Sequence, residues 1–406
     1  MAGLGAALRG RCAVCTVAAT LACAPGKGAP GGAGDSDSGA PVDSVPFAVP
    51  LAGCYGYHTA AALVGEQTLH LWVDSGSSTT AVASDLCTNC AQESVSQVYD
   101  TAHGTATGLG ADATYLNDDS WVGRVFRDDV TLGEAPAVNM AFAAITRQNW
   151  MFRDYVCDYA TESVPLEGIL GLGPDDWRDH RTNAYLRRLT RGSVPDSFAL
   201  RLCHAGGTLW LGGFDSSVTT GEMVFADMVD PGYFIDVRSF EVWPSGGASS
   251  TVTASETSDS LPAFLDSGDS ALIVPSAAYA ALTTAITADP AFAALGDAAW
   301  WTSPEGTTLS TSPAEMNAAL PRLVVHLSGD AASQLILPAT ESYLLQYELA
   351  PGSYLYLTNL YSDGDSDLPS DFLDLGNLPM YSYVVYTDRE NSRVGFAPAV
   401  PCEDEE

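Results

Sequence analysis

The stretch from Leu69 to Thr80 reads L-H-L-W-V-D-S-G-S-S-T-T and decides the fold. An apolar run, Leu71 to Val73, leads directly into Asp74 and a Ser-Gly turn. This pattern predicts a buried strand that ends with a carboxylate at its tip. One copy is a weak signal, because Asp, Ser and Gly are ordinary turn residues. Asp37-Ser38-Gly39 has the same three letters but no apolar run before it.

The pattern occurs a second time, 192 positions later. Leu261 to Pro275 reads L-P-A-F-L-D-S-G-D-S-A-L-I-V-P, in which Phe264 and Leu265 lead into Asp266. This repeat at about one domain's length predicts a duplicated lobe, with one carboxylate from each copy. Both copies resemble the motif of the pepsin-like aspartic proteases, which is hydrophobic-hydrophobic-Asp-Ser/Thr-Gly-Ser/Thr in each lobe.

Further segments resemble the same family in the same order, so that the resemblance covers about residues 46 to 400. They are the first hairpin from Pro46 with its turn at Leu63 to Glu66, a flap hairpin from Ala113 to Gly123, E-G-I-L-G-L-G from Glu167 to Gly173, a hairpin within Phe198 to Gly221, and closing strands from Val384 to Ala397. Leu375-Gly376-Asn377 mirrors Leu170-Gly171 of the first lobe. Pro244 to Ser260 is rich in Ser, Thr and Gly and is expected to form a long loop.

Length and composition agree with two lobes. The chain has 406 residues, of which 46% are hydrophobic and 17% charged, enough for two lobes of about 150 to 200 residues with apolar cores. Short β-rich segments broken by turn residues predict an all-β fold with a few short helices. The resemblance implies the bilobal pepsin-like fold with pseudo-twofold symmetry. The expected parts are a signal peptide (1–24), a disordered linker or vestigial prosegment (25–45), an N-terminal lobe (46–226), a C-terminal lobe (227–400) and an acidic tail (401–406).

The N-terminus resembles a secretory signal. Arg9 and Arg11 precede the apolar run Cys12 to Ala24, which is too short to span a membrane. We therefore expect no membrane anchor, and a location outside the cell or in an endomembrane or vacuolar lumen. The following segment, 25–45, has one lysine and no arginine, unlike the basic propeptide that pepsin-like zymogens carry.

An even number of cysteines follows this signal and predicts disulfides, although six cysteines allow fifteen pairings. They are Cys54, Cys87, Cys90, Cys157, Cys203 and Cys402. Cys87-Thr-Asn-Cys90 could also suggest zinc or redox chemistry, but no second C-x-x-C or histidine pair completes a metal set. The resemblance implies a small disulfide loop shortly after Asp74. We expect no metal and no cofactor.

The formal net charge is −33, and Lys27 is the only lysine. A surface of this charge repels nucleic acid and anionic membranes, so neither is an expected partner. Two explanations fit the surplus of acid. One is solubility or adaptation to high salt, and the other is work at low pH, where protonation of carboxylates reduces self-repulsion. Charge alone does not separate them.

Two neighbouring carboxyls suffice to hydrolyse a peptide bond if one is ionised and the other protonated. The first takes a proton from water while the second donates one to the carbonyl oxygen. Carboxyls in contact cannot easily ionise together, so they titrate as a coupled pair, for which aspartic proteases are the general example. The resemblance makes Asp74 and Asp266 this catalytic pair. The sequence has no H-E-x-x-H or G-x-S-x-G motif.

The resemblance also implies roles for the residues around the pair. Ser77 is expected to hydrogen-bond the outer oxygen of the first aspartate, and Tyr115 to close over bound substrate. Gly76 and Gly268 would let the two turns pack together. Trp121 either lines the cleft or has only a packing role.

Two positions depart from the family pattern. Asp269 stands at the position that matches Ser77, where the family usually has Thr or Ser. An ionised third carboxylate would raise the pKa values of the pair, whereas a protonated one could donate the hydrogen bond that Thr supplies. We therefore expect altered pH dependence. Ala81 stands where pepsins carry a tryptophan that supports the flap tyrosine.

The sequence thus predicts a monomeric acid endopeptidase that binds an extended polypeptide between two β-rich lobes. The alternative is a pepsin-like protein that has lost catalysis and serves as a binding protein or inhibitor. A third possibility is a secreted carbohydrate-active β protein with paired carboxylates. The paired D-S-G turns do not support this last reading.

Overall fold

The computed structural model describes residues 46–402, apart from gaps at 55–56, 93, 116–118, 150, 153–163, 175–180, 193, 231, 245–247, 294, 296–299, 302, 304, 329–332 and 366–367. The expected signal peptide and the linker lie outside the described residues, as does the tail from 403 onward. None of the helices in the described part is both long and apolar enough to cross a bilayer.

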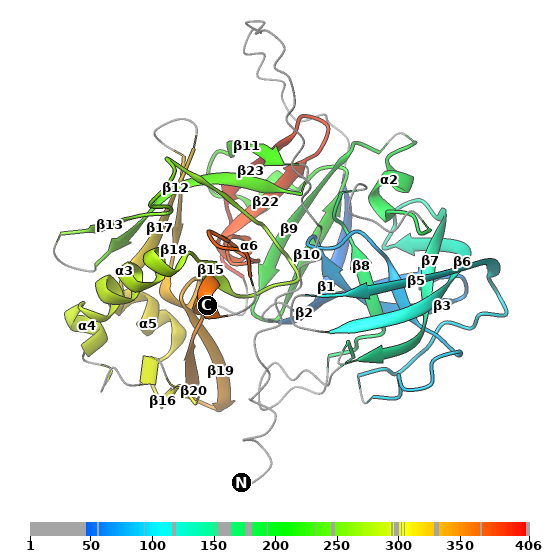
Figure 1. Cartoon of the computed structure of the whole chain (residues 1–406), viewed down its shortest axis with the longest axis horizontal. Helices are drawn as coiled ribbons and strands as arrows, with labels where there is room; N and C mark the ends of the chain where they lie inside the picture. The colour runs from blue at the N-terminus through cyan, green and yellow to red at the C-terminus, as the bar shows by residue number, and fades with distance from the viewer. Residues whose placement is uncertain are drawn as a thin grey trace, which may run out of the picture.

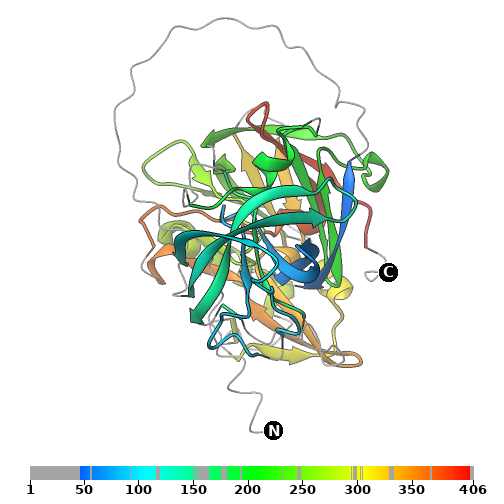
Figure 2. The same cartoon turned by 90° about the vertical axis from the view of Figure 1, so that its right-hand side faces the viewer.

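The first half of the chain is built mainly from strands, on the right of Figure 1. They are β1 (Phe47–Cys54), β2 (Tyr57–Val64), β3 (Gln67–Asp74), β4 (Ala81–Ala83), β5 (Thr105–Thr114), β6 (Ser120–Leu132), β7 (Val138–Asn149), β8 (Gly168–Gly171), β9 (Ser197–Cys203) and β10 (Gly206–Leu211), with helix α2 (Tyr185–Leu189) and the 3₁₀ turn η2 (Ser216–Val218). Figure 2 shows this half from its own side, with β5 to β7 in front.

The predicted hairpins are present. Strands β2 and β3 pair in antiparallel register around a turn at Gly65 and Glu66. Gly65 adopts φ +59° there, a left-handed conformation that favours glycine. Strands β5 and β6 form the expected flap hairpin, and β9 and β10 form the next one.

The segment E-G-I-L-G-L-G crosses beside the first aspartate turn. Strand β8 runs parallel to β3, with Gly171 opposite Asp74. A Cβ atom on Gly171 would lie 2.6 Å from the backbone carbon of Ser78, so only glycine lets the two segments approach this closely.

The second half combines strands with short helices, on the left of Figure 1. Its elements are β11 (Val224–Asp230), β12 (Phe234–Trp243), β13 (Ser250–Thr253), β14 (Leu261–Ala263), β15 (Leu272–Val274), α3 (Ser276–Thr287), α4 (Pro290–Ala293), β16 (Thr307–Leu309), α5 (Pro313–Ala319), β17 (Arg322–Leu327), β18 (Gln334–Leu337), η4 (Ala339–Glu341), β19 (Leu344–Ala350), β20 (Ser353–Thr358), β21 (Leu360–Ser362), η5 (Asp363–Asp365), α6 (Pro379–Ser382), β22 (Tyr383–Asp388) and β23 (Arg393–Pro398).

Strand β13 corrects one expectation, since it lies inside the segment 244–260 that was expected to be a loop. It pairs with β12 and buries Val252 while its Ser and Thr side chains stay exposed. A polar composition does not prevent a strand when one face is open to solvent.

The two halves share a sheet and a core. The β22–β23 hairpin, red in Figure 1, pairs with β9 of the first half, and β11 pairs with β23. One apolar cluster takes residues from both halves, including Val73, Leu170, Leu265 and Leu375. The predicted all-β, pepsin-like architecture is therefore confirmed. The expected lobe boundary at 226/227 falls inside β11 and stays a prediction.

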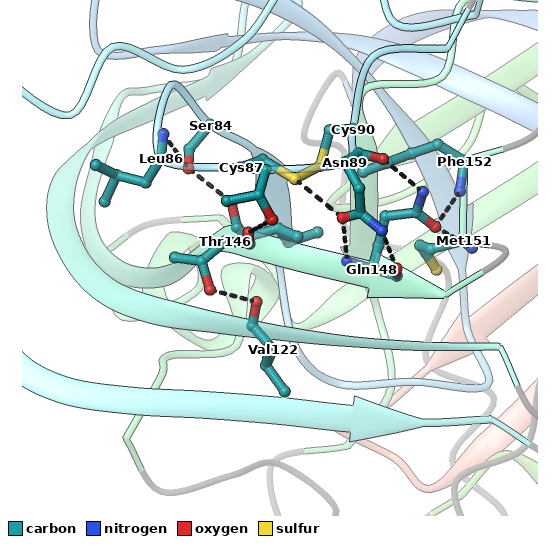
Figure 3. Close-up of a disulfide and its surroundings, with 12 residues drawn as sticks. Ser84, Leu86, Cys87, Asn89, Cys90, Val122, Thr146, Gln148, Met151 and Phe152 are labelled. Atoms are coloured by element: carbon teal, nitrogen blue, oxygen red, sulfur yellow. Dashed lines mark hydrogen bonds between the residues drawn. A yellow bond between two sulfur atoms is a disulfide. The ribbon is translucent and has the colours of Figure 1, made fainter.

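Two disulfides are defined in the described residues. Cys87 and Cys90 are joined, as the family resemblance implied, and Figure 3 shows the loop that they close. The Asn89 side chain fixes this loop to β7 by donating to the Gln148 carbonyl (2.7 Å) and accepting from the Gln148 N–H (3.0 Å). Cys203 and Cys402 form the second bond. Cys54 is also disulfide-bonded.

The two disulfides close loops of very different length, which leads to a prediction. The Cys203–Cys402 bond spans 199 positions and the Cys87–Cys90 bond only 3. Because a longer closed loop restricts the unfolded chain more, replacing Cys203 and Cys402 by Ser should lower the free energy of unfolding by about 3 to 5 kcal/mol, against about 1 to 2 kcal/mol for Cys87 and Cys90. Urea unfolding of both double variants measures this. Equal losses would contradict the chain-entropy explanation.

Candidate active site

Two buried turns, one from each half of the chain, bring Asp74 and Asp266 together. Asp74 is the last residue of β3, and Asp266 follows the apolar run that continues β14. Both aspartates have no exposed surface. Each lies at the end of an apolar strand in the core, which is why the carboxyls are inside the molecule rather than on a surface loop.

Serine residues join the two turns by reciprocal hydrogen bonds. The Ser75 N–H donates to Ser267 Oγ (2.9 Å), and the Ser267 N–H donates to Ser75 Oγ (2.8 Å). Each hydroxyl then donates across to the other half, Ser75 Oγ to the Leu265 carbonyl (2.9 Å) and Ser267 Oγ to the Val73 carbonyl (2.9 Å). All these groups are buried, so the bonds fix the two turns against each other.

The two glycines lie where the turns come closest. The Gly76 N–H lies 2.8 Å from Asp74 Oδ1 and 3.1 Å from Asp266 Oδ1, so it faces both carboxyls. The Gly268 N–H donates to Asp266 Oδ1 (2.8 Å). A Cβ on Gly268 would lie 2.7 Å from Asp74 Oδ1, and one on Gly76 would overlap the Asp266 carboxyl. Larger residues would therefore push the two carboxyls apart.

The carboxyl environments differ. Burial raises the pKa of Asp74, and the Ser77 hydroxyl, the Asp266 side chain and the Gly76 N–H partly offset this rise. Burial also raises the pKa of Asp266 well above its usual range, and repulsion by Asp74 adds to the rise. The two carboxyls therefore titrate as a coupled pair, in which the loss of one proton opposes the loss of the other.

Ser77 and Asp269 occupy matching positions in the two turns. Ser77 Oγ is buried and close enough to lower the pKa of Asp74, but not in the geometry of a regular hydrogen bond. Asp269 accepts from the Ala271 N–H (2.9 Å) through Oδ1, and burial raises its pKa to about 7. Of the two states considered for Asp269, the protonated one prevails in acid.

Tyr115 has a tryptophan partner although position 81 is an alanine. Trp121 Nε1, on β6, donates to the Tyr115 hydroxyl (3.0 Å). Both side chains are buried in one apolar cluster that also includes Ala81 and Trp72. Trp121 thus contacts the expected flap tyrosine from within the same hairpin. The flap tip, 116–118, lies outside the described residues.

Two further buried acids were not identified from the sequence. Glu167 accepts from the His70 N–H (2.6 Å), from His70 Nδ1 (3.0 Å) and from Ser96 Oγ (2.6 Å), and fixes the start of β8. Asp374 is fully buried and accepts from the Gly376 N–H (2.7 Å). A similar sequence pattern could have identified both acids. Glu167 directly precedes an apolar segment that contains Leu-Gly, and Asp374 lies inside one. In the described part of the chain, no three His, Cys, Asp or Glu side chains are grouped as metal ligands.

Comparison with known proteins agrees with this geometry. The family model for eukaryotic aspartyl proteases matches residues 64–399. The chain is 27% identical over 241 residues to an aspartic protease of Phaffia rhodozyma, covering 59% of this chain and 55% of that protein. It is 29% identical over 220 residues to Rhizopuspepsin-4 of Rhizopus niveus, covering 51% of this chain and 50% of that protein.

The chain spans about half the length of these curated relatives. The family match is much longer and includes both aspartate turns, the flap hairpin and the closing strands. On this evidence the chain belongs to the eukaryotic aspartyl protease family.

Proposed function

We propose that this protein is an aspartic endopeptidase that hydrolyses extended polypeptides in acid through Asp74 and Asp266. The observation that carries the proposal is the geometry of the pair: two fully buried carboxyls, facing one shared N–H of Gly76 and fixed by reciprocal serine bonds. Such a pair holds one proton between two sites and can act as base and acid in one step.

The reaction needs one ionised and one protonated carboxyl, and we assign the base to Asp74 and the acid to Asp266. Ionised Asp74 removes a proton from a water molecule, whose oxygen attacks the carbonyl carbon of the peptide bond. Protonated Asp266 donates its proton to the carbonyl oxygen, which gives a neutral tetrahedral diol. As the C–N bond breaks, Asp74 transfers its proton to the leaving amine, and Asp266 recovers a proton from the diol hydroxyl. Both aspartates then return to their starting states.

Further features of the structure support the proposed binding of an extended peptide, the proposed cellular location and the proposed monomeric state. The Tyr115–Trp121 pair gives the flap a fixed base from which to close over an extended peptide. Disulfides such as Cys203–Cys402 persist in oxidising compartments, which supports a secreted enzyme or one in the vacuolar or another endomembrane lumen. We propose that it works as a monomer, because the described residues of one chain supply both catalytic carboxyls.

Asp74→Asn and Asp266→Asn test the catalytic pair. Each variant removes either the base or the acid while keeping the shape of the side chain, so the rate of cleavage should fall by about a thousandfold or more. The measurement is cleavage of a denatured protein from about pH 3 to pH 7, with and without pepstatin. Asp289→Asn is the matched control, because Asp289 is a buried carboxyl of the second half that caps α4 through the Ala291 N–H.

Activity that survives in both variants would show that the pair is not catalytic. Absence of cleavage by the unmodified protein at every pH, with a normal unfolding transition, would instead favour the alternative of a binding or inhibitor protein. Release of oligosaccharides rather than peptides would favour a carbohydrate-active enzyme.

The flap hydrogen bond can be tested by Trp121→Phe and Tyr115→Phe. Either change removes the bond but keeps an aromatic ring, so kcat/KM should fall about five- to tenfold. The double variant should lose no more than either single variant, since the bond can be lost only once. Losses that multiply in the double variant would mean that the two residues act separately.

A further inference from the structure

The second half of the molecule carries an aspartate where the first half carries an isoleucine. In the first half, Ile169 on β8 pairs in parallel with Trp72 and antiparallel with Ala81. These partners stand two positions before and seven positions after Asp74. Ile169 is fully buried.

Asp374 has the same pairing around the other catalytic aspartate. It forms a parallel bridge with Phe264 and an antiparallel bridge with Ile273. These residues stand two positions before and seven positions after Asp266. Asp374 is therefore the pseudo-twofold counterpart of Ile169, which agrees with the mirrored Leu-Gly letters that follow each of them.

A second difference of the same kind between the two halves lies next to the first. Asp269 follows Asp266 by three positions, as Ser77 follows Asp74. The two segments are packed together, because the Asn377 N–H donates to the Asp269 carbonyl (2.8 Å) and a Cβ on Gly376 would lie 2.6 Å from that same oxygen. The second half thus has carboxyls at both positions where the first half has a hydroxyl and an aliphatic side chain.

Neither carboxyl is neutralised by a partner in the described structure. Each has one oxygen bonded to a backbone N–H, Asp269 to that of Ala271 and Asp374 to that of Gly376. The second oxygen of each is buried and makes no hydrogen bond to the described residues. Burial without a neutralising partner favours the protonated form of each carboxyl.

We propose that Asp374 is a positioning residue for the catalytic proton: together with Asp269 it forms a second carboxyl pair that opposes ionisation of Asp266 and extends activity toward neutral pH. This inference rests on the proposed endopeptidase function. Asp374 does not need to touch substrate, because it acts through the charge balance of the buried cluster.

The pKa directions agree with this geometry. After burial, the strongest causes that raise the pKa of Asp266 are the charges of Asp74, Asp374 and Asp269, in that order. Burial sets the pKa of Asp269 at about 7, with Asp74 adding to the rise. Burial also raises the pKa of Asp374 well above its usual range, and Asp269 adds to it.

These influences couple the four carboxyls to one another. The charge of Asp74 raises the pKa of Asp269, the charge of Asp269 raises that of Asp374, and all three raise that of Asp266. An ionised carboxylate of the second pair therefore opposes loss of the proton from Asp266.

The test is the pH dependence of kcat/KM for Asp374→Asn and Asp374→Ile, which introduce a neutral isostere and the residue of the first half. Activity is lost on the alkaline side when Asp266 loses its proton. Removing a carboxyl that opposes this loss should move the alkaline limb toward lower pH by about one unit for each variant. Asp269→Ser should act in the same direction, and combining it with Asp374→Ile should give the largest shift. Asp289→Asn, outside the cluster, should leave the limb unchanged.

An infrared titration supplies a readout that needs no activity. The absorption of protonated carboxyl groups, followed from about pH 3 to pH 9, should show fewer groups that stay protonated near neutral pH in Asp374→Asn than in the unmodified protein. An alkaline limb that stays in place in both Asp374 variants, with normal unfolding transitions, would overturn the inference. If the unmodified protein cleaves nothing, the endopeptidase proposal fails, and the infrared titration still decides whether the second pair exists.

Discussion

The reciprocal bonds between Ser75 and Ser267 are the constraint on which the rest of the site depends. Two carboxyls repel each other once both are charged, and each is costly to bury. They remain together because hydroxyl and backbone groups of one half form hydrogen bonds with the corresponding groups of the other half in the core. Neither turn has these partners without the opposite half, so the geometry of the aspartate pair is a property of the joined molecule.

Much of this arrangement could be predicted from the sequence, because the decisive signals are local. An apolar run followed by Asp-Ser-Gly identifies each turn, and its repetition identifies the pair. The hairpins around Gly65 and after Tyr115 follow from turn residues between alternating strands. What could not be predicted depends on contacts across strands. The bond from Trp121 to Tyr115 depends on the register of the β5–β6 hairpin. Asp374 is recognised as the counterpart of Ile169 only from its bridges to Phe264 and Ile273. The Cys203–Cys402 pairing likewise required the position of Cys402 beyond β23.

The other buried carboxyls differ in the direction in which their pKa values are shifted. The difference follows from the number of hydrogen-bond donors around each carboxyl. Glu167 is surrounded by donors from His70, Ser96 and Gln97, and although burial opposes this, its pKa is lowered. Asp269 and Asp374 each accept one backbone N–H, and burial raises their pKa values. A buried carboxyl of the first half, Glu167, therefore favours the ionised form, whereas the buried carboxyls Asp269 and Asp374 of the second half favour the protonated form.

The bond between Cys203 and Cys402 has a consequence for a protein that is proposed to cleave polypeptides. It joins a residue at the end of β9 to one beyond β23, so that nearly the whole second half lies inside a covalent ring. A single cut in any loop of that ring opens the chain but releases no fragment. The nicked molecule stays one covalent unit with both aspartate turns attached, whereas the same cut would divide a chain without this bond into two pieces.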